Sequence, residues 1–188
     1  MNNDVKNNSK QNIAKHIFRL ALFAMWVCLL IVIFYFSSQE AEESTRRSVS
    51  VGKAVCSIII KDFDKLTDSD QYDYAHSIDH FIRKQAHFCE YMLLGMLTLN
   101  AFYVLFVMIS RKSDRFRAFK EPFPVRSVTA LIFCAIYAAS DELHQYFVPG
   151  RFASPKDVLL DTLGALTGIA ILILIWQLSR KLKSKKRK

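Results

Sequence analysis

Apolar and polar positions alternate along the chain in long blocks, and this pattern predicts helices that cross a membrane. About 20 residues are needed to span a hydrocarbon core of about 30 Å. Four stretches approach that length: 17–36, 84–109, 125–147 and 158–178. The first is the cleanest prediction, because Arg19 near its start is its only charge. We therefore expect an all-α, polytopic integral membrane protein with four transmembrane helices.

A long polar segment, residues 37–82, separates the first two apolar stretches. Part of it, residues 48–60, has the apolar spacing of one helix face. That face consists of Val51, Val55, Ile58 and Ile59. The pattern fits an amphipathic helix on the outer leaflet or a re-entrant segment, and it fits equally well a small extracellular cap. The acidic stretch 62–79 is predicted to be a loop.

The net charge of +9 becomes informative once it is placed along the chain. Lysine and arginine gather in 1–19, 111–126 and 179–188, whereas the segment 37–82 is rich in acid. Basic residues favour the cytoplasmic side of a membrane. We therefore predict a single domain over 1–188 with cytoplasmic tails at 1–16 and 179–188 and an extracytoplasmic segment at 37–82. The basic C-terminal tail is interpreted as a topology determinant beside anionic lipid, so no nucleic-acid partner is expected.

Polar side chains lie at the predicted outer end of every span, although an ionisable group costs about 2.5–3.5 kcal/mol at the bilayer centre. Helical spacing places several of them on common faces. On the second span they are Arg83, His87 and Glu90. On the third they are Asp141, His144 and Gln145. On the fourth they are Asp157 and Asp161, which form a stripe with Gly164 and Gly168. The two glycines form a GxxxG pattern, which lets a neighbouring helix approach closely and favours the packed side for both aspartates.

Five of these residues are predicted to meet in one polar pocket that opens to the outside, where they carry the chemistry. They are His87, Glu90, Asp141, His144 and Asp161. Depth supports the prediction, because Asp141 and Asp161 each lie about 9 Å along a helix from its outer end. Ligand contacts are expected from Arg83, Glu142, Gln145, Arg151, Asp157, Ser38 and Gln39. The acids need these cations, protons or a bound divalent metal to be tolerated.

Each motif also has a purely structural interpretation. The run 154–157 (Ser-Pro-Lys-Asp) is a helix N-terminus signature, which explains Asp157 equally well as a cap. Other residues suit roles at the ends of spans: Arg83 and Lys84 as interfacial anchors, Tyr91 and Tyr146 as interface aromatics, Ser38 and Gln39 as the end of a helix.

Four motif blocks occur in order along the chain. They are Phe36-Ser37-Ser38-Gln39, Arg83-Lys84-x-Ala86-His87-Phe88-x-Glu90-Tyr91-x-x-Leu94-Gly95, Ser140-Asp141-Glu142-x-His144-Gln145-x-Phe147-x-Pro149-Gly150-Arg151, and Asp157-x-x-x-Asp161-x-x-Gly164-x-x-x-Gly168. Together they resemble the VanZ-like family of bacterial membrane proteins. The resemblance implies a multi-pass protein of the bacterial cytoplasmic membrane with a role in the cell envelope. The family's namesake accompanies a vancomycin-resistance cluster and confers low-level teicoplanin resistance, so the resemblance implies a phenotype and no particular reaction.

Three function classes are compatible with these residues. A membrane enzyme, a hydrolase or transferase acting on a lipid or cell-wall precursor, could use a divalent metal held by the His/Asp/Glu cluster, or a histidine as general base. A non-catalytic protein could bind a membrane lipid, a lipid-linked cell-wall component or a lipoglycopeptide in the same pocket. An ion-coupled carrier ranks last, because the sequence shows no inverted repeat.

Overall fold

The computed structural model describes residues 2–112 and 123–185, and these residues fold into helices. In chain order the elements are α1 (Asn2–Ser37), α2 (Ala41–Ile59), the 3-10 helix η1 (Phe63–Lys65), α3 (Asp68–Ser77), α4 (Asp79–Lys112), α6 (Phe123–Gln145) and α7 (Pro155–Lys185). The all-α prediction is confirmed within this part of the chain. The basic residues predicted to set the topology at 113–120 and 186–188 lie outside the described residues, as do the side chains of 1–12 and 109–112.

Three helices of the described part are long and apolar enough to cross a membrane. They are residues Ile13–Ser37 of α1, Asp79–Met108 of α4, and Pro155–Lys185, the whole of α7. The third predicted span, residues 125–147, corresponds to α6, which does not meet this criterion. Its polar run from Ser140 to Gln145 shortens the apolar part of a helix of only 23 residues.

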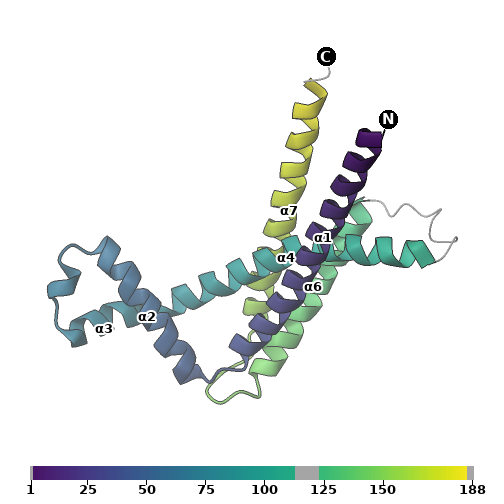
Figure 1. The fold of residues 1–188 in the computed structure, drawn as a ribbon. Coiled ribbons are helices and arrows are strands. Elements are labelled where there is room, and N and C mark those ends of the chain that lie inside the picture. Colours follow the sequence, from purple (N-terminus) through teal and green to yellow (C-terminus); the bar gives the residue numbers. More distant parts are fainter. Residues whose placement is uncertain (1, 113–122, 186–188) are drawn as a thin grey trace.

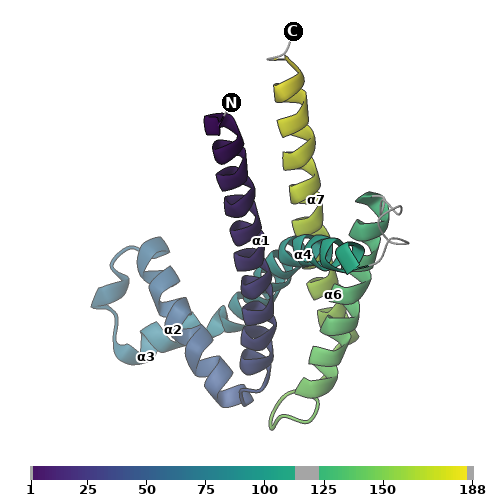
Figure 2. The ribbon, with the colours of Figure 1, turned by 45° about the vertical axis from the view of Figure 1, so that its right-hand side comes forward.

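The long helices are not four parallel columns. In Figures 1 and 2, α4 runs across α1, α6 and α7, while the N-terminal end of α1 and the C-terminal end of α7 lie on the same side of the molecule. At the opposite end, the backbone N–H of Ala41 donates to Pro149 O at 3.3 Å and joins the α1–α2 junction to the α6–α7 loop. The polar ends of α1, α6 and α7 therefore lie together around the first half of α4.

Glycines allow α4 and α7 to pack backbone to backbone. A Cβ added at Gly164 would collide with Phe88 O, and one at Gly168 would collide with Met92 O. From the other helix, a Cβ at Gly95 would meet the backbone of Ala165. The GxxxG pattern therefore works as the sequence predicts, with α4 as the helix that approaches α7.

The interior of the crossing is formed by small and aromatic side chains from all four long helices. Its fully buried members include Ile33, Tyr91, Cys134 and Ala165. The interpretation of Tyr91 as an interface aromatic is wrong, because its side chain is 0% exposed at the centre of this cluster. Polar contacts hold α1 in place, since the hydroxyl of Tyr137 donates to Leu30 O at 2.7 Å.

The segment between α1 and α4 is more ordered than the sequence suggested. The predicted helix at 48–60 is confirmed as part of α2, but the acidic stretch 62–79 is not a loop, since it contains η1 and α3. The reason is local: acids in the first turn of α3 lie at the positive end of the helix dipole, and Thr67 caps it. Gly52 of α2 lets α3 approach at Ala75.

The apolar face that predicted α2 points away from the protein. Val51, Ile58 and Ile59 are 51%, 85% and 75% exposed, whereas Val49, Gly52 and Cys56 are buried. A helix with an outward apolar face and an inward small-residue face fits the amphipathic alternative.

Replacing the cap of α3 gives a local test of this segment. The hydroxyl of Thr67 accepts from the backbone N–H of Asp70 at 3.2 Å and donates to Oδ2 of Asp70 at 2.7 Å. We expect Thr67→Ala to destabilise α3 by about 1 kcal/mol. Hydrogen exchange should show faster amide exchange confined to α3. Ser69→Ala is the control, because Ser69 is not the N-cap residue, and it should leave the exchange unchanged. Unchanged α3 protection in Thr67→Ala would contradict the capping role.

Candidate functional site

Three side chains from three different helices converge at the polar end of the molecule. His87 comes from α4, Asp141 from α6 and Asp161 from α7. One ligand-type atom of each lies within 4.8 Å of the others. The close backbone approach of α4 at Gly164, less than one turn beyond Asp161, brings that aspartate against α4.

His87, Asp141 and Asp161 are called the trio below. Its two carboxylates are buried without a full set of hydrogen-bond partners. Asp161 is 1% exposed and Asp141 is 4% exposed. Among the described residues, neither oxygen of Asp161 has a hydrogen-bond partner, and the same holds for Oδ1 of Asp141 and Nδ1 of His87. The hydroxyls of Ser37 and Tyr91 are similarly buried and unpartnered in this part of the chain. Buried polar atoms normally have hydrogen-bond partners. Because these atoms have none among the described residues, a proton or a cation bound by the trio would supply the missing interaction.

Neighbouring side chains contact two members of the trio. The amide of Gln145 donates to Oδ2 of Asp141 at 3.0 Å, and Nη1 of Arg151 donates to Oε1 of Gln145 at 3.1 Å. Oε2 of Glu90 lies 4.0 Å from Nδ1 of His87. The orientation of Asp141 is thus supported by a residue one turn away on the same helix, whereas Glu90 lies beside His87 without a hydrogen bond to it.

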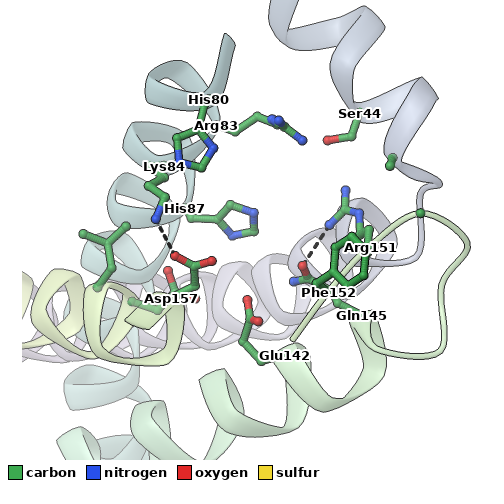
Figure 3. Close-up of a pocket in the computed structure, with 14 residues that line it drawn as sticks. Ser44, His80, Arg83, Lys84, His87, Glu142, Gln145, Arg151, Phe152 and Asp157 are labelled. Carbon is green, nitrogen blue, oxygen red and sulfur yellow. Dashed lines mark hydrogen bonds and ion pairs between the residues drawn. The ribbon is translucent and has the colours of Figure 1, made fainter. Parts of the chain in front are cut away.

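A polar cavity of about 300 Å³ opens beside the trio. Figure 3 shows Arg83, Lys84 and His87 entering it from α4, Arg151 from the α6–α7 loop and Ser44 from α2. Two of the cations have acidic partners: Nη2 of Arg83 lies 3.1 Å from Asp79, and Nζ of Lys84 lies 2.8 Å from Asp157.

Arg151 differs from these cations because its hydrogen-bond partners are neutral. Besides Gln145, it donates from Nη2 to Phe36 O at 3.3 Å. Burial lowers the pKa of Arg151 from its ordinary value, and the nearby Arg83 lowers it further. An anion in the polar cavity would relieve both effects.

A second cavity of about 280 Å³ adjoins the first and has a different character. Its wall contains Phe36, Val51, Ile82 and Ala86, together with Gln39, Arg47, Ser48 and Glu90. The two cavities share four residues, Ser44, Arg83, His87 and Arg151. A polar chamber and a largely apolar chamber therefore meet at a boundary made of two arginines, a histidine and a serine.

Other residues predicted for the site have more structural surroundings. The ring of His144 stacks on Phe34 with centroids 4.7 Å apart, and its Nε2 lies 3.1 Å from the hydroxyl of Ser38, so His144 is not brought to the trio. Glu142 lines the polar cavity and accepts the backbone N–H of Ser154 at 2.8 Å. Asp157 lies in the first turn of α7, as the capping signature predicts, and also reaches Lys84.

Sequence reasoning missed two polar side chains that line the polar cavity, Ser44 and His80. Ser44 belongs to α2, whose position could not be inferred from the sequence. His80 follows directly after the acidic stretch 62–79, which was predicted to be a loop, and lies in the first turn of α4. The only available signal was its spacing of seven residues from His87, which is two turns of a helix.

The fold and these polar helix ends define an all-helical membrane-protein class with a polar cluster at one end of its long helices. A family model described as VanZ/LLP1 matches residues 22–176, which includes all four long helices in whole or in part. The chain belongs to this VanZ-like family. No curated protein and no solved structure matches the chain.

Proposed function

We propose that this protein crosses the bacterial cytoplasmic membrane four times, with both termini in the cytoplasm, and binds an anionic amphiphile of the cell envelope from the extracytoplasmic side. The observation that carries the proposal is the junction of the two cavities at Arg83 and Arg151. The polar cavity binds the headgroup of the amphiphile, and the apolar cavity binds the first part of its hydrocarbon chain.

The proposed topology is supported by charge and by shape. Basic residues predominate near the free ends of α1 and α7, which lie on the same side of the molecule in Figure 1. The acidic segment 37–82 joins the opposite end. This distribution agrees with the preference of lysine and arginine for the cytoplasmic side.

The headgroup proposal follows from two guanidinium groups, Arg83 and Arg151, that line the polar cavity. Arg151 has neutral hydrogen-bond partners, and the buried Nε of Arg83 is without one among the described residues. Guanidinium groups form short, strong, bidentate hydrogen bonds with phosphate and carboxylate oxygens. A phosphate group is the headgroup that this pair fits best.

The proposal that the ligand carries a hydrocarbon chain follows from the second cavity and from α2. Phe36, Val51, Ile82 and Ala86 give that cavity an apolar wall next to the arginines. Val51 is also half exposed on the outward face of α2. A lipid or lipid-linked cell-wall precursor, which carries phosphate next to hydrocarbon, has the matching order of polar and apolar parts. The lipid tail and polar body of a teicoplanin-type glycopeptide have the same order, and we extend the proposal to an effect on susceptibility to such compounds.

Binding of dodecyl phosphate to the purified full chain in neutral detergent tests this proposal. We expect dodecyl phosphate to bind more tightly than either dodecanol or inorganic phosphate, because each of these lacks one of the two matching parts. Ala86→Trp should fill the apolar cavity and weaken dodecyl phosphate binding by about tenfold, which is about 1.4 kcal/mol.

The matched control is Ala54→Trp, which adds the same side chain at an exposed position of α2 outside both cavities. It should leave binding unchanged. Equal binding of dodecyl phosphate and dodecanol, or equal loss in the two tryptophan variants, would contradict the proposal.

A further inference from the structure

We propose that His87, Asp141 and Asp161 form a binding site for one divalent transition-metal ion, with Zn²⁺ or Mn²⁺ as the ion class. This inference deepens the proposed function, because the site borders the polar cavity and would place the ion next to the headgroup. It rests on the trio's own geometry and burial, and it can fail while amphiphile binding stands.

The first argument is uncompensated charge. Asp161 is 1% exposed, and both its oxygens lack hydrogen-bond partners in the described part of the chain. The cations nearby are directed elsewhere: Arg83 to Asp79, Lys84 to Asp157, and Arg151 to Gln145 and Phe36 O. A buried carboxylate without a basic partner is costly unless it takes up a proton or coordinates a metal.

The second argument is the donor set. One imidazole nitrogen and two carboxylates come from three separate helices, with one ligand atom each. Imidazole suits Zn²⁺ and other transition ions, and carboxylates suit Mn²⁺ as well, so the mixture favours a first-row divalent ion over Ca²⁺ or Mg²⁺. His87 and Asp161 also line the polar cavity, so a fourth coordination position would face it.

The third argument is the support around the donors. Gln145 holds one oxygen of Asp141 and leaves the other without a partner among the described residues. Glu90 lies beside His87 on the same helix. A residue that hydrogen-bonds to a metal ligand, as Gln145 does to Asp141, commonly sets the geometry and basicity of that ligand.

The distances need only a small adjustment. Bonds of about 2.1 Å place two ligands of a tetrahedral ion about 3.4 Å apart. The trio's ligand atoms lie within 4.8 Å of one another, so side-chain movements of about an ångström close the site.

Metal binding by the purified full chain tests the inference. After chelator treatment and its removal, the protein should bind one Zn²⁺ per chain by calorimetry and one Mn²⁺ per chain by electron paramagnetic resonance. Asp161→Asn and His87→Gln should each weaken binding by at least about 100-fold. Asp141→Asn is the third variant, so the test does not depend on one substitution folding well.

The chain offers matched controls of the same residue types. Asp73→Asn changes an exposed aspartate of α3 that lines neither cavity, and His144→Gln changes the histidine that stacks on Phe34. Both should keep stoichiometric binding, and added Zn²⁺ should raise the thermal midpoint of the wild type and of the controls but not of Asp161→Asn. Absence of stoichiometric metal on the wild type, or equal loss in trio and control variants, would overturn the inference.

The same samples separate this inference from the proposed function. If chelated protein binds dodecyl phosphate as tightly as before and no metal binds, the metal site is wrong and the amphiphile site stands. If metal binds with the expected variant pattern but dodecyl phosphate does not, the metal site stands and the headgroup proposal fails.

Discussion

Replacing Gly168 with leucine is expected to prevent stable folding of the protein in the membrane. Even a Cβ at this position would collide with the backbone oxygen of Met92, which cannot move without displacing α4. Overpacking of a tight core costs about 1–3 kcal/mol and sometimes more, and a leucine against backbone belongs at the upper end of that range. The thermal midpoint of detergent-purified protein and the fraction recovered as a single monodisperse species should both fall sharply.

Ala170→Leu is the matched control for this substitution. Ala170 lies on the exposed face of the same helix. Leucine at this position therefore adds a bulky side chain to α7 without contacting α4. The control should fold as the wild type does. Comparable stability of the Gly168 and Ala170 variants would show that α4 and α7 do not pack backbone to backbone.

Replacing Arg151 with glutamine is expected to weaken dodecyl phosphate binding by about 10- to 100-fold. Arg151 lines both cavities, and its hydrogen-bond partners are neutral. A hydrogen bond to a charged group contributes about 1.5–3 kcal/mol, and 1.4 kcal/mol corresponds to a factor of ten. Titration calorimetry with dodecyl phosphate measures the loss directly.

Arg46→Gln removes the same charge elsewhere, on α2. The side chain of Arg46 is 77% exposed and pairs with Glu43 three residues earlier, so its removal should leave binding unchanged. If Arg151→Gln binds as well as the wild type, or if both variants lose affinity equally, Arg151 does not contact the headgroup.

Much of the helical fold could be predicted from the sequence, because it depends on local patterns. The apolar stretch before Ser37 and the Ser-Pro-Lys-Asp signature before α7 specify helices through length and capping, and GxxxG specifies a close helix contact. The same local reasoning failed at α3, where acidic residues suggested a loop but serve as favourable first-turn residues.

The site was only partly accessible to such reasoning, because spacing tells which residues share a face and not which faces meet. His87, Asp141 and Asp161 meet because α4 crosses α7 next to Gly164, whereas His144, one turn from Asp141, faces Phe34 on α1. Tyr91 was assigned to the interface because aromatics are common there, but the crossing of the helices places it in the interior. The contribution of Ser44 depends on the position of α2, which only tertiary structure supplies.

The outward apolar face of α2 has a consequence for how affinities should be expressed. In the proposed orientation, Val51 belongs both to that face and to the wall of the apolar cavity, so a single helix separates bound hydrocarbon from the surrounding leaflet. An amphiphile dissolved in the leaflet then arrives by lateral diffusion, and its occupancy follows its mole fraction among the lipids. Titrations in nanodiscs of increasing amphiphile content should therefore collapse onto one curve when plotted against that fraction, whatever the total protein concentration.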